Sequence, residues 1–138
     1  MTVSQSFVKL LEDSGYGKFG QDIFLYRVPN SLKTQTELFY IIPTGGNSVD
    51  KLATGESIRL YQFAIYYRSQ SAQQVDETLS NLEEFLSCAK CVQLEGFQLM
   101  SIDVSQYPTN QDLDVENRAI GLLQVHVTVY KTCRDSES

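Results

Sequence analysis

The sequence lacks a long apolar run and an export signal. No stretch of the chain approaches the roughly 20 consecutive apolar residues that a membrane-spanning helix needs. The N-terminal stretch MTVSQSFVKLLEDSG is amphipathic, whereas a secretion signal joins a basic segment to an apolar core. We therefore expect a chain that is made and used in the cytosol and has no membrane partner.

Basic residues are also scarce. Eleven lysines and arginines stand against seventeen acidic residues, which gives a net charge of -6. Proteins that wrap nucleic acid gain affinity by neutralising phosphates with basic side chains, and this chain has the opposite balance. The composition argues against a protein that binds DNA or RNA tightly.

Cysteine and histidine are too few for most of the chemistry they support. Cys88, Cys91 and Cys133 form an odd set, which predicts free thiols. The C-x-x-C pair ends a predicted helix, where the helix dipole disfavours a thiolate. Small buried cysteines explain the pattern better than zinc, because His126 and Cys133 would lie about 23 Å apart along a regular strand.

The residues that are present predict a folded chain. With 138 residues and 42% apolar content, we expect one domain over residues 1–138, with residues 134–138 as a flexible tail. The periodicity predicts an α+β fold of order α-β-β-β-α-β-β, with a mainly antiparallel or mixed sheet packed against two amphipathic helices. The expected helices cover residues 3–14 and 71–89, and the expected strands cover residues 22–29, 37–43, 58–68, 96–107 and 118–131.

The helix over residues 71–89 carries the clearest pattern. Ser71 and Gln74 are spaced as a capping box, which places the start of the helix. The strand over residues 58–68 has large groups on both alternating sets and is expected to be central in the sheet. The apolar stripe of the helix consists of Val75, Leu79, Leu82, Leu86 and Ala89, and the expected core face of the last strand of Leu123, Val125, Val127 and Val129.

Two polar segments are predicted to be functional surface loops. Residues 44–57 contain paired glycines and little apolar content, and residues 108–117 start with proline and carry three acidic residues. The expected partner contacts in these loops are Thr44, Gly45, Gly46, Asn47, Asp50, Lys51, Asp112, Asp114 and Glu116.

The stretch GYGKFG, residues 15–20, matches the G-x-G-x-x-G pattern of dinucleotide-binding proteins. In those proteins the glycines follow a strand and open a helix, whose N-terminus binds the pyrophosphate. Here the predicted helix comes first and the predicted strand second, so the nearby helix end is the negative one. We interpret the three glycines as turn residues.

No set of residues predicts catalysis, a metal site or a cofactor. His126 has Gln124, Thr128 and Tyr130 as its same-face neighbours along the strand, and none of these is a carboxylate. The adjacent carboxylates of the chain, such as Asp112 with Asp114, lie in polar surroundings that do not raise a pKa. We expect a protein that is not an enzyme.

Aromatic residues are in excess, with eight tyrosines and seven phenylalanines. Tyr61, Tyr66 and Tyr67 lie on one predicted strand, and tyrosine is enriched at protein interfaces. These three side chains are candidates for a subunit interface, and packing in the core of one chain is the alternative.

Three features of the sequence occur together: the stretch GKFGQDIFLYRVPN, the TGG stretch after the second predicted strand, and the order of elements through the C-terminal strand pair. In these features the sequence resembles the tail-terminator and minor capsid proteins of long-tailed bacteriophages. The matching residues are Gly17, Gly20, Asp22, Ile23, Phe24, Pro29, Thr44, Gly45 and Gly46, whereas Leu25, Tyr26 and Arg27 depart from the pattern.

The resemblance implies a structural virion protein, assembled in the host cytoplasm, that closes the tail. Such a protein would form a ring, of six subunits, between the tail tube protein and a head-neck connector protein, with no cofactor. DNA would pass through an acidic ring without binding. Two alternatives remain: a neck or head-closure protein of the same particle, and a cytosolic α+β ligand-binding module or small enzyme.

Overall fold

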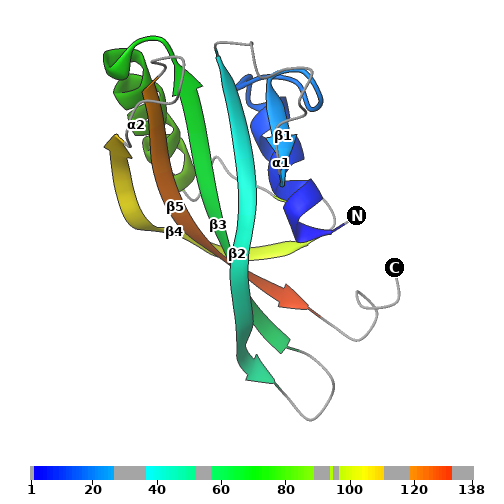
Figure 1. Ribbon diagram of the computed structural model, residues 1–138. Helices are drawn as coiled ribbons and strands as arrows, with labels where there is room; N and C mark the ends of the chain where they lie inside the picture. The colour runs from blue at the N-terminus through cyan, green and yellow to red at the C-terminus, as the bar shows by residue number, and fades with distance from the viewer. Residues whose placement is uncertain are drawn as a thin grey trace.

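The computed structural model describes residues 2–26, 37–51, 57–88, 94, 97–110 and 119–131. Over these residues the chain forms two helices and a five-stranded mixed sheet in the order α-β-β-β-α-β-β (Figure 1). The predicted α+β class and element order are confirmed. The helices are α1 (Val3–Asp13) and α2 (Ala72–Ser87), and the strands are β1 (Ile23–Leu25), β2 (Leu38–Lys51), β3 (Ser57–Ser69), β4 (Gln98–Asn110) and β5 (Ala119–Lys131).

The strands lie in the order β1-β2-β3-β5-β4, so β3 is central, as its two apolar faces predicted. β1 pairs with β2 in parallel, and the other neighbours pair antiparallel. β1 and β4 are the two edges of the sheet among the described residues.

Both helices pack on one face of the sheet. Phe7 of α1 stacks on Phe63 of β3 with ring centroids 4.9 Å apart, and Leu79 of α2 is buried in the same apolar cluster. The predicted stripe of α2 is buried over the described residues, as is the predicted core face of β5. Burying each of these leucines contributes about 1.5 to 3 kcal/mol, which fixes the orientation of α2.

The helix ends are set by local hydrogen bonds. α1 begins with a full capping box, because Thr2 and Gln5 exchange side-chain to backbone bonds of 3.1 and 2.9 Å. At α2, the Ser71 hydroxyl accepts from the Gln74 backbone N–H at 3.3 Å, as predicted. The second bond of a capping box would join the Gln74 side chain to the Ser71 backbone N–H. Here the Gln74 side chain donates to Glu37 instead, and the Ser71 backbone N–H donates to the Ser69 hydroxyl.

The predicted loop over residues 44–57 is wrong for residues 44–51 and 57, and residues 52–56 lie outside the described residues. β2 continues through Pro43 and the paired glycines to Lys51, and β3 already starts at Ser57. The register shifts between Pro43 and Gly45, and again between Ser48 and Asp50, and such bulges absorb residues that a regular strand disfavours. The far end of this long hairpin extends beyond the two helices (Figure 1).

Other boundaries also differ from the prediction. Of the strand expected over residues 22–29, the described residues form Ile23–Leu25, and Tyr26 then turns the chain with a φ of 76°. Residues 27–29 lie outside the described residues. The loop expected over residues 108–117 begins later, since β4 includes residues 108–110. The remainder of that loop and the expected tail, residues 134–138, lie outside the described residues.

Candidate functional site

The G-x-G-x-x-G stretch forms the turn between α1 and β1, as predicted. Gly15, Gly17 and Gly20 all have positive φ, of 89°, 153° and 86°. The Lys18 carbonyl accepts the backbone N–H groups of Gln21, Asp22 and Ile23 at 3.0, 2.9 and 3.2 Å, which closes the turn on itself. These glycines are turn residues, and the helix beside them presents its C-terminal end.

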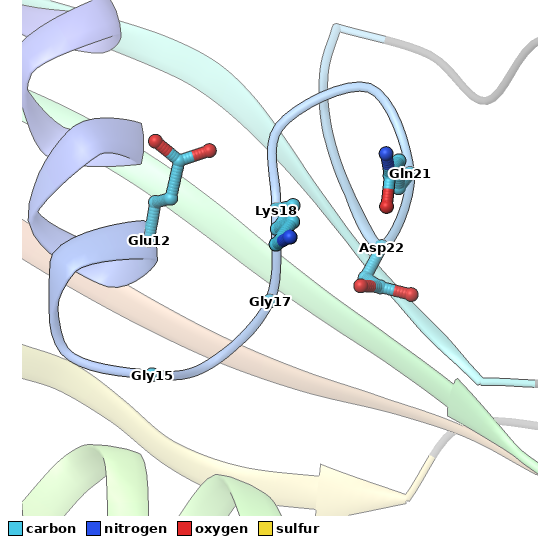
Figure 2. Close-up of a pocket in the computed structure, with 6 residues that line it drawn as sticks. All are labelled: Glu12, Gly15, Gly17, Lys18, Gln21 and Asp22. Atoms are coloured by element: carbon cyan, nitrogen blue, oxygen red, sulfur yellow. The ribbon is translucent and has the colours of Figure 1, made fainter.

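This turn surrounds an open hollow of about 650 Å³ (Figure 2). Its charged lining residues are Glu12 at the end of α1, Lys18 in the turn and Asp22 before β1. Two carboxylates, one ammonium and the negative end of a helix disfavour a phosphate here. The hollow therefore does not restore the nucleotide-binding interpretation of the motif.

Tyr16, inside the glycine motif, anchors the turn to the core. Its ring centroid lies 6.1 Å from that of Phe39 on β2 and 5.9 Å from that of Phe85 on α2. Burial raises the pKa of the Tyr16 phenol above its usual value. This contact links the turn to both the sheet and the second helix.

A second concave surface runs beside α1 and β1. This groove, of about 400 Å³, is lined by Val8 and Lys9 of α1, Leu25 of β1 and the aromatic side chains of Phe19 and Tyr26. Gln5 and Glu12 complete the lining. Phe19 is 56% exposed and Tyr26 60% exposed, so the aromatic part of the groove faces solvent. The sequence did not predict this groove, because Tyr26 falls within the strand expected over residues 22–29, whereas in the structure it follows the end of β1.

The predicted partner contacts are placed only in part. Thr44, Gly45 and Gly46 are exposed on β2, within a strand rather than in a loop. Asn47, Asp50 and Lys51 follow in the same strand, near the far end of the hairpin. The predicted contacts Asp112, Asp114 and Glu116 lie outside the described residues.

The three candidate tyrosines lie on opposite faces of β3. Tyr67 is only 6% exposed and belongs to the core on the helix face, and Tyr61 packs against the same core while half-buried. Tyr66 lies on the opposite face, where its ring stacks on that of Tyr40 at 4.7 Å. Tyr66 is therefore the candidate that stands on the face without helices, and its role in a subunit interface stays a prediction.

The Tyr67 hydroxyl belongs to a polar cluster at the start of α2. The Gln74 side-chain amide donates to the Tyr67 hydroxyl at 3.4 Å and to the Glu37 carboxylate at 2.9 Å, and it accepts from Ser69 at 2.9 Å. Burial, and then the negative charge of Glu37, raise the pKa of Tyr67 above its usual value. The cluster fixes the entry to α2.

The sheet register adds a neighbour to His126 that its own strand does not provide. Along β5 its neighbours are not acidic, but β4 places Asp103 directly across from it in the sheet register. Neighbours on one strand are visible in the sequence, whereas cross-strand neighbours depend on the pairing. Asp103 is exposed, so this pair lies on the solvent-facing side of the sheet.

The described residues give no cluster of metal-ligating side chains. Cys88 is the half-buried C-terminal cap residue of α2 and forms no disulfide with a described residue, whereas Cys91 and Cys133 lie outside the described residues. Over the same part of the chain, neither helix has the length and apolar content needed to cross a bilayer.

Comparisons with known proteins give a match at the level of structure. No protein-family model matches the sequence, and no curated protein does. The fold is similar to that of a chain in a structure described as "Virion of native gene transfer agent (GTA) particle", with a TM-score of 0.63. The two chains share 12% sequence identity, and the match covers 94% of this chain and 98% of the other. At this identity the match shows a shared fold over almost the whole of both chains.

Proposed function

We propose that the chain is a structural protein of a phage-like virion that forms a ring at the end of the tail tube and joins it to the head-neck complex. The main support is the fold shared with a chain of a gene transfer agent virion, which extends over nearly all of both molecules. Because that likeness concerns the fold, the role in tail termination also depends on the resemblance in sequence motifs.

The described surface suits a protein that works by contacts. The hairpin of β2 and β3 reaches beyond the helices, and an extended hairpin is well shaped to contact a neighbouring subunit or a partner (Figure 1). Sheet edges β1 and β4 offer further contact surfaces. The net charge of -6 agrees with a ring through which DNA passes without adhering.

Electron microscopy of tubes assembled with this protein tests the proposal. Tail tube protein from the same genome is polymerised with and without the purified chain, and the tubes are imaged in negative stain. We expect a ring at one end of each tube and an arrest of its growth. Uncapped tubes of unchanged length would contradict tail termination, and rings found only on the connector would favour a neck protein.

The acidic segment supplies a first variant for this assay. Replacing Asp112, Asp114 and Glu116 by serine removes three charges from a predicted partner contact. We expect the melting temperature to stay within a few degrees, because substitutions in a loop that the sequence predicts to be exposed change stability little. Capping should fall roughly tenfold or more, as expected when several charged contacts are lost. Undiminished capping would remove this segment from the proposed interface.

A further inference from the structure

The large apolar side chains that are exposed in the described part of the molecule lie near the two edges of the sheet. Phe19 and Tyr26 flank β1, and Met100, 52% exposed, lies on β4 at the other edge. Large apolar groups in solvent mark interaction surfaces when they are grouped with a concave site. Two different surfaces on opposite edges are what a head-to-tail contact between identical subunits requires.

We propose that the groove between α1 and β1 of one subunit receives the Met100 segment of β4 from a second copy of this chain. The inference deepens the proposed ring function and rests on it, since a contact between two unlike surfaces repeats around a closed ring. The groove offers Val8, Leu25 and two aromatic rings, and methionine is a flexible side chain that packs well against aromatic rings.

The charges of the two surfaces are complementary. Lys9 lines the groove, and Asp103, exposed on β4 three residues beyond Met100, is the acidic group of the opposing edge. Glu12, the acidic residue of the groove, already accepts the Phe19 backbone N–H at 2.8 Å. An apolar centre with a charged pair at its rim is the usual arrangement of a specific interface.

The irregularity of β4 favours side-chain contacts over strand pairing between subunits. Its register against β5 shifts at three places, the first between Leu99 and Ser101, where Met100 lies. Bulges twist an edge strand and turn its side chains outward, which prevents a neighbour from extending the sheet. β1 is also unsuited to strand pairing, because it is only 3 residues long.

The backbone at Tyr26 supports the assignment of the groove. A tyrosine with a φ of 76° is uncommon, because a side chain beyond Cβ disfavours the left-handed region. Here the Tyr26 backbone N–H donates to the Ile41 carbonyl at 2.9 Å, which holds the chain in this turn and the ring at the end of the groove. Strained residues with exposed aromatic side chains are candidates for binding sites.

Two variants that damage opposite surfaces test the contact. Phe19→Asp alters the groove and leaves β4 intact, whereas Met100→Asp alters β4 and leaves the groove intact. Asn81→Asp on the exposed face of α2 is the control, because it adds the same charge at an exposed position outside the groove lining and outside β4. Circular dichroism checks that all three remain folded, and native mass spectrometry with sedimentation velocity at up to millimolar concentration measures the oligomers.

We expect the wild-type chain and Asn81→Asp to form closed rings, and each of the other two variants to self-associate roughly 30-fold more weakly. Mixing Phe19→Asp with Met100→Asp should give a heterodimer and nothing larger. Each heterodimer is held by the intact groove of the Met100→Asp chain and the intact β4 edge of the Phe19→Asp chain. The remaining groove and the remaining edge are both damaged, so no third chain can bind.

The result that overturns the inference differs from the result that overturns the proposed function. If the two variants form rings as the wild-type chain does, or if their mixture gives no heterodimer, the groove is not the subunit contact, although the chain can still cap tubes. A wild-type chain that stays monomeric at millimolar concentration also contradicts the contact. Failure of the wild-type chain to cap tubes contradicts the proposed function whatever the variants do.

Discussion

A glycine inside strand β2 is required by the neighbouring strand rather than by a turn. A Cβ placed on Gly46 would collide with the Leu60 backbone carbonyl of β3 and would lie 3.3 Å from the Tyr61 Cα. Backbone atoms cannot move aside as a flexible side chain does. Gly46, predicted as a partner contact, therefore has a structural reason to be glycine that must be separated from any role in docking.

Gly46→Ala should destabilise the fold by about 1 to 3 kcal/mol, the usual cost of inserting a carbon into a packed site. Thr44→Ala, at an exposed position of the same strand, should change the free energy of unfolding by about 0.5 kcal/mol or less. Urea unfolding of both variants measures the difference. Equal stabilities would show that the strands separate at the bulge without cost.

Tyr67 links the stability of the fold to alkaline pH. Its pKa is raised above the usual tyrosine value of about 10 by burial and then by Glu37, so the folded protein favours the neutral phenol. The stability that the neutral Tyr67 phenol adds is complete at pH values below the pKa of this tyrosine in the unfolded chain. It is lost as the pH rises through the higher pKa of Tyr67 in the folded chain. Stability should therefore begin to fall near pH 10, as the tyrosine of the unfolded chain loses its proton first.

Tyr67→Phe should make the free energy of unfolding fall less steeply as the pH rises above about 10. At neutral pH the substitution should cost about 0.5 to 1.5 kcal/mol of stability, because one hydrogen bond with Gln74 disappears. Urea unfolding at several pH values between neutral and strongly alkaline measures both effects. Tyr16→Phe is the matched variant, since the pKa of Tyr16 is raised by burial alone. An unchanged alkaline loss in both variants would assign the effect to other groups.

At the scale of elements, α2 shows that a short polar motif can place a helix while its partners vary. The Ser71 hydroxyl caps the Gln74 backbone N–H, as the sequence pattern predicted. The Gln74 side chain instead joins Glu37 and Ser69, because the tertiary structure places those groups within reach. The bond to the Ser71 hydroxyl is therefore local in sequence, whereas the partners of the Gln74 side chain depend on the fold.

Ser71→Ala should destabilise the protein by about 1 kcal/mol, the typical cost of losing an N-cap. Ser87→Ala, at the opposite end of α2 and exposed, is the control and should change stability by a few tenths of a kcal/mol. Thermal unfolding followed by circular dichroism compares the two. A loss at Ser71 no larger than that at Ser87 would indicate that packing of the helix alone determines where it begins.

At the scale of the whole molecule, the face of the sheet opposite the helices carries both polar and aromatic groups. His126 with Asp103, and Tyr40 with Tyr66, are cross-strand pairs on this face. The acidic balance of the chain applies to the molecule as a whole, and it predicts how the proposed ring would interact with DNA.

The protein should not retain double-stranded DNA. A fluorescently labelled duplex titrated with the chain at low salt should show an affinity weaker than about 10⁻⁴ M, because phosphate binding requires lysines and arginines on one surface. Repeating the titration on assembled rings tests the same property of the lumen. Tight binding that weakens steeply with added salt would contradict a passage through which DNA moves freely.

The sequence by itself determined the elements whose signal is local. The stripe of α2 and the alternation of β5 follow from the periods of 3.6 and 2 residues, and the order of helix before strand identified Gly15, Gly17 and Gly20 as turn residues. These patterns are decided by neighbours within a few residues along the chain.

Only the tertiary structure decided how distant segments meet. Pro43 and the paired glycines predict a loop by themselves, yet pairing with β3 keeps them in a bulged strand, because hydrogen bonds across the ladder outweigh the local preference. The carboxylate opposite His126 and the groove beside α1 likewise arise from contacts between segments far apart in sequence. Residues close together in sequence determine where the helices and strands form. Contacts between distant segments determine the surfaces that the proposed ring would use.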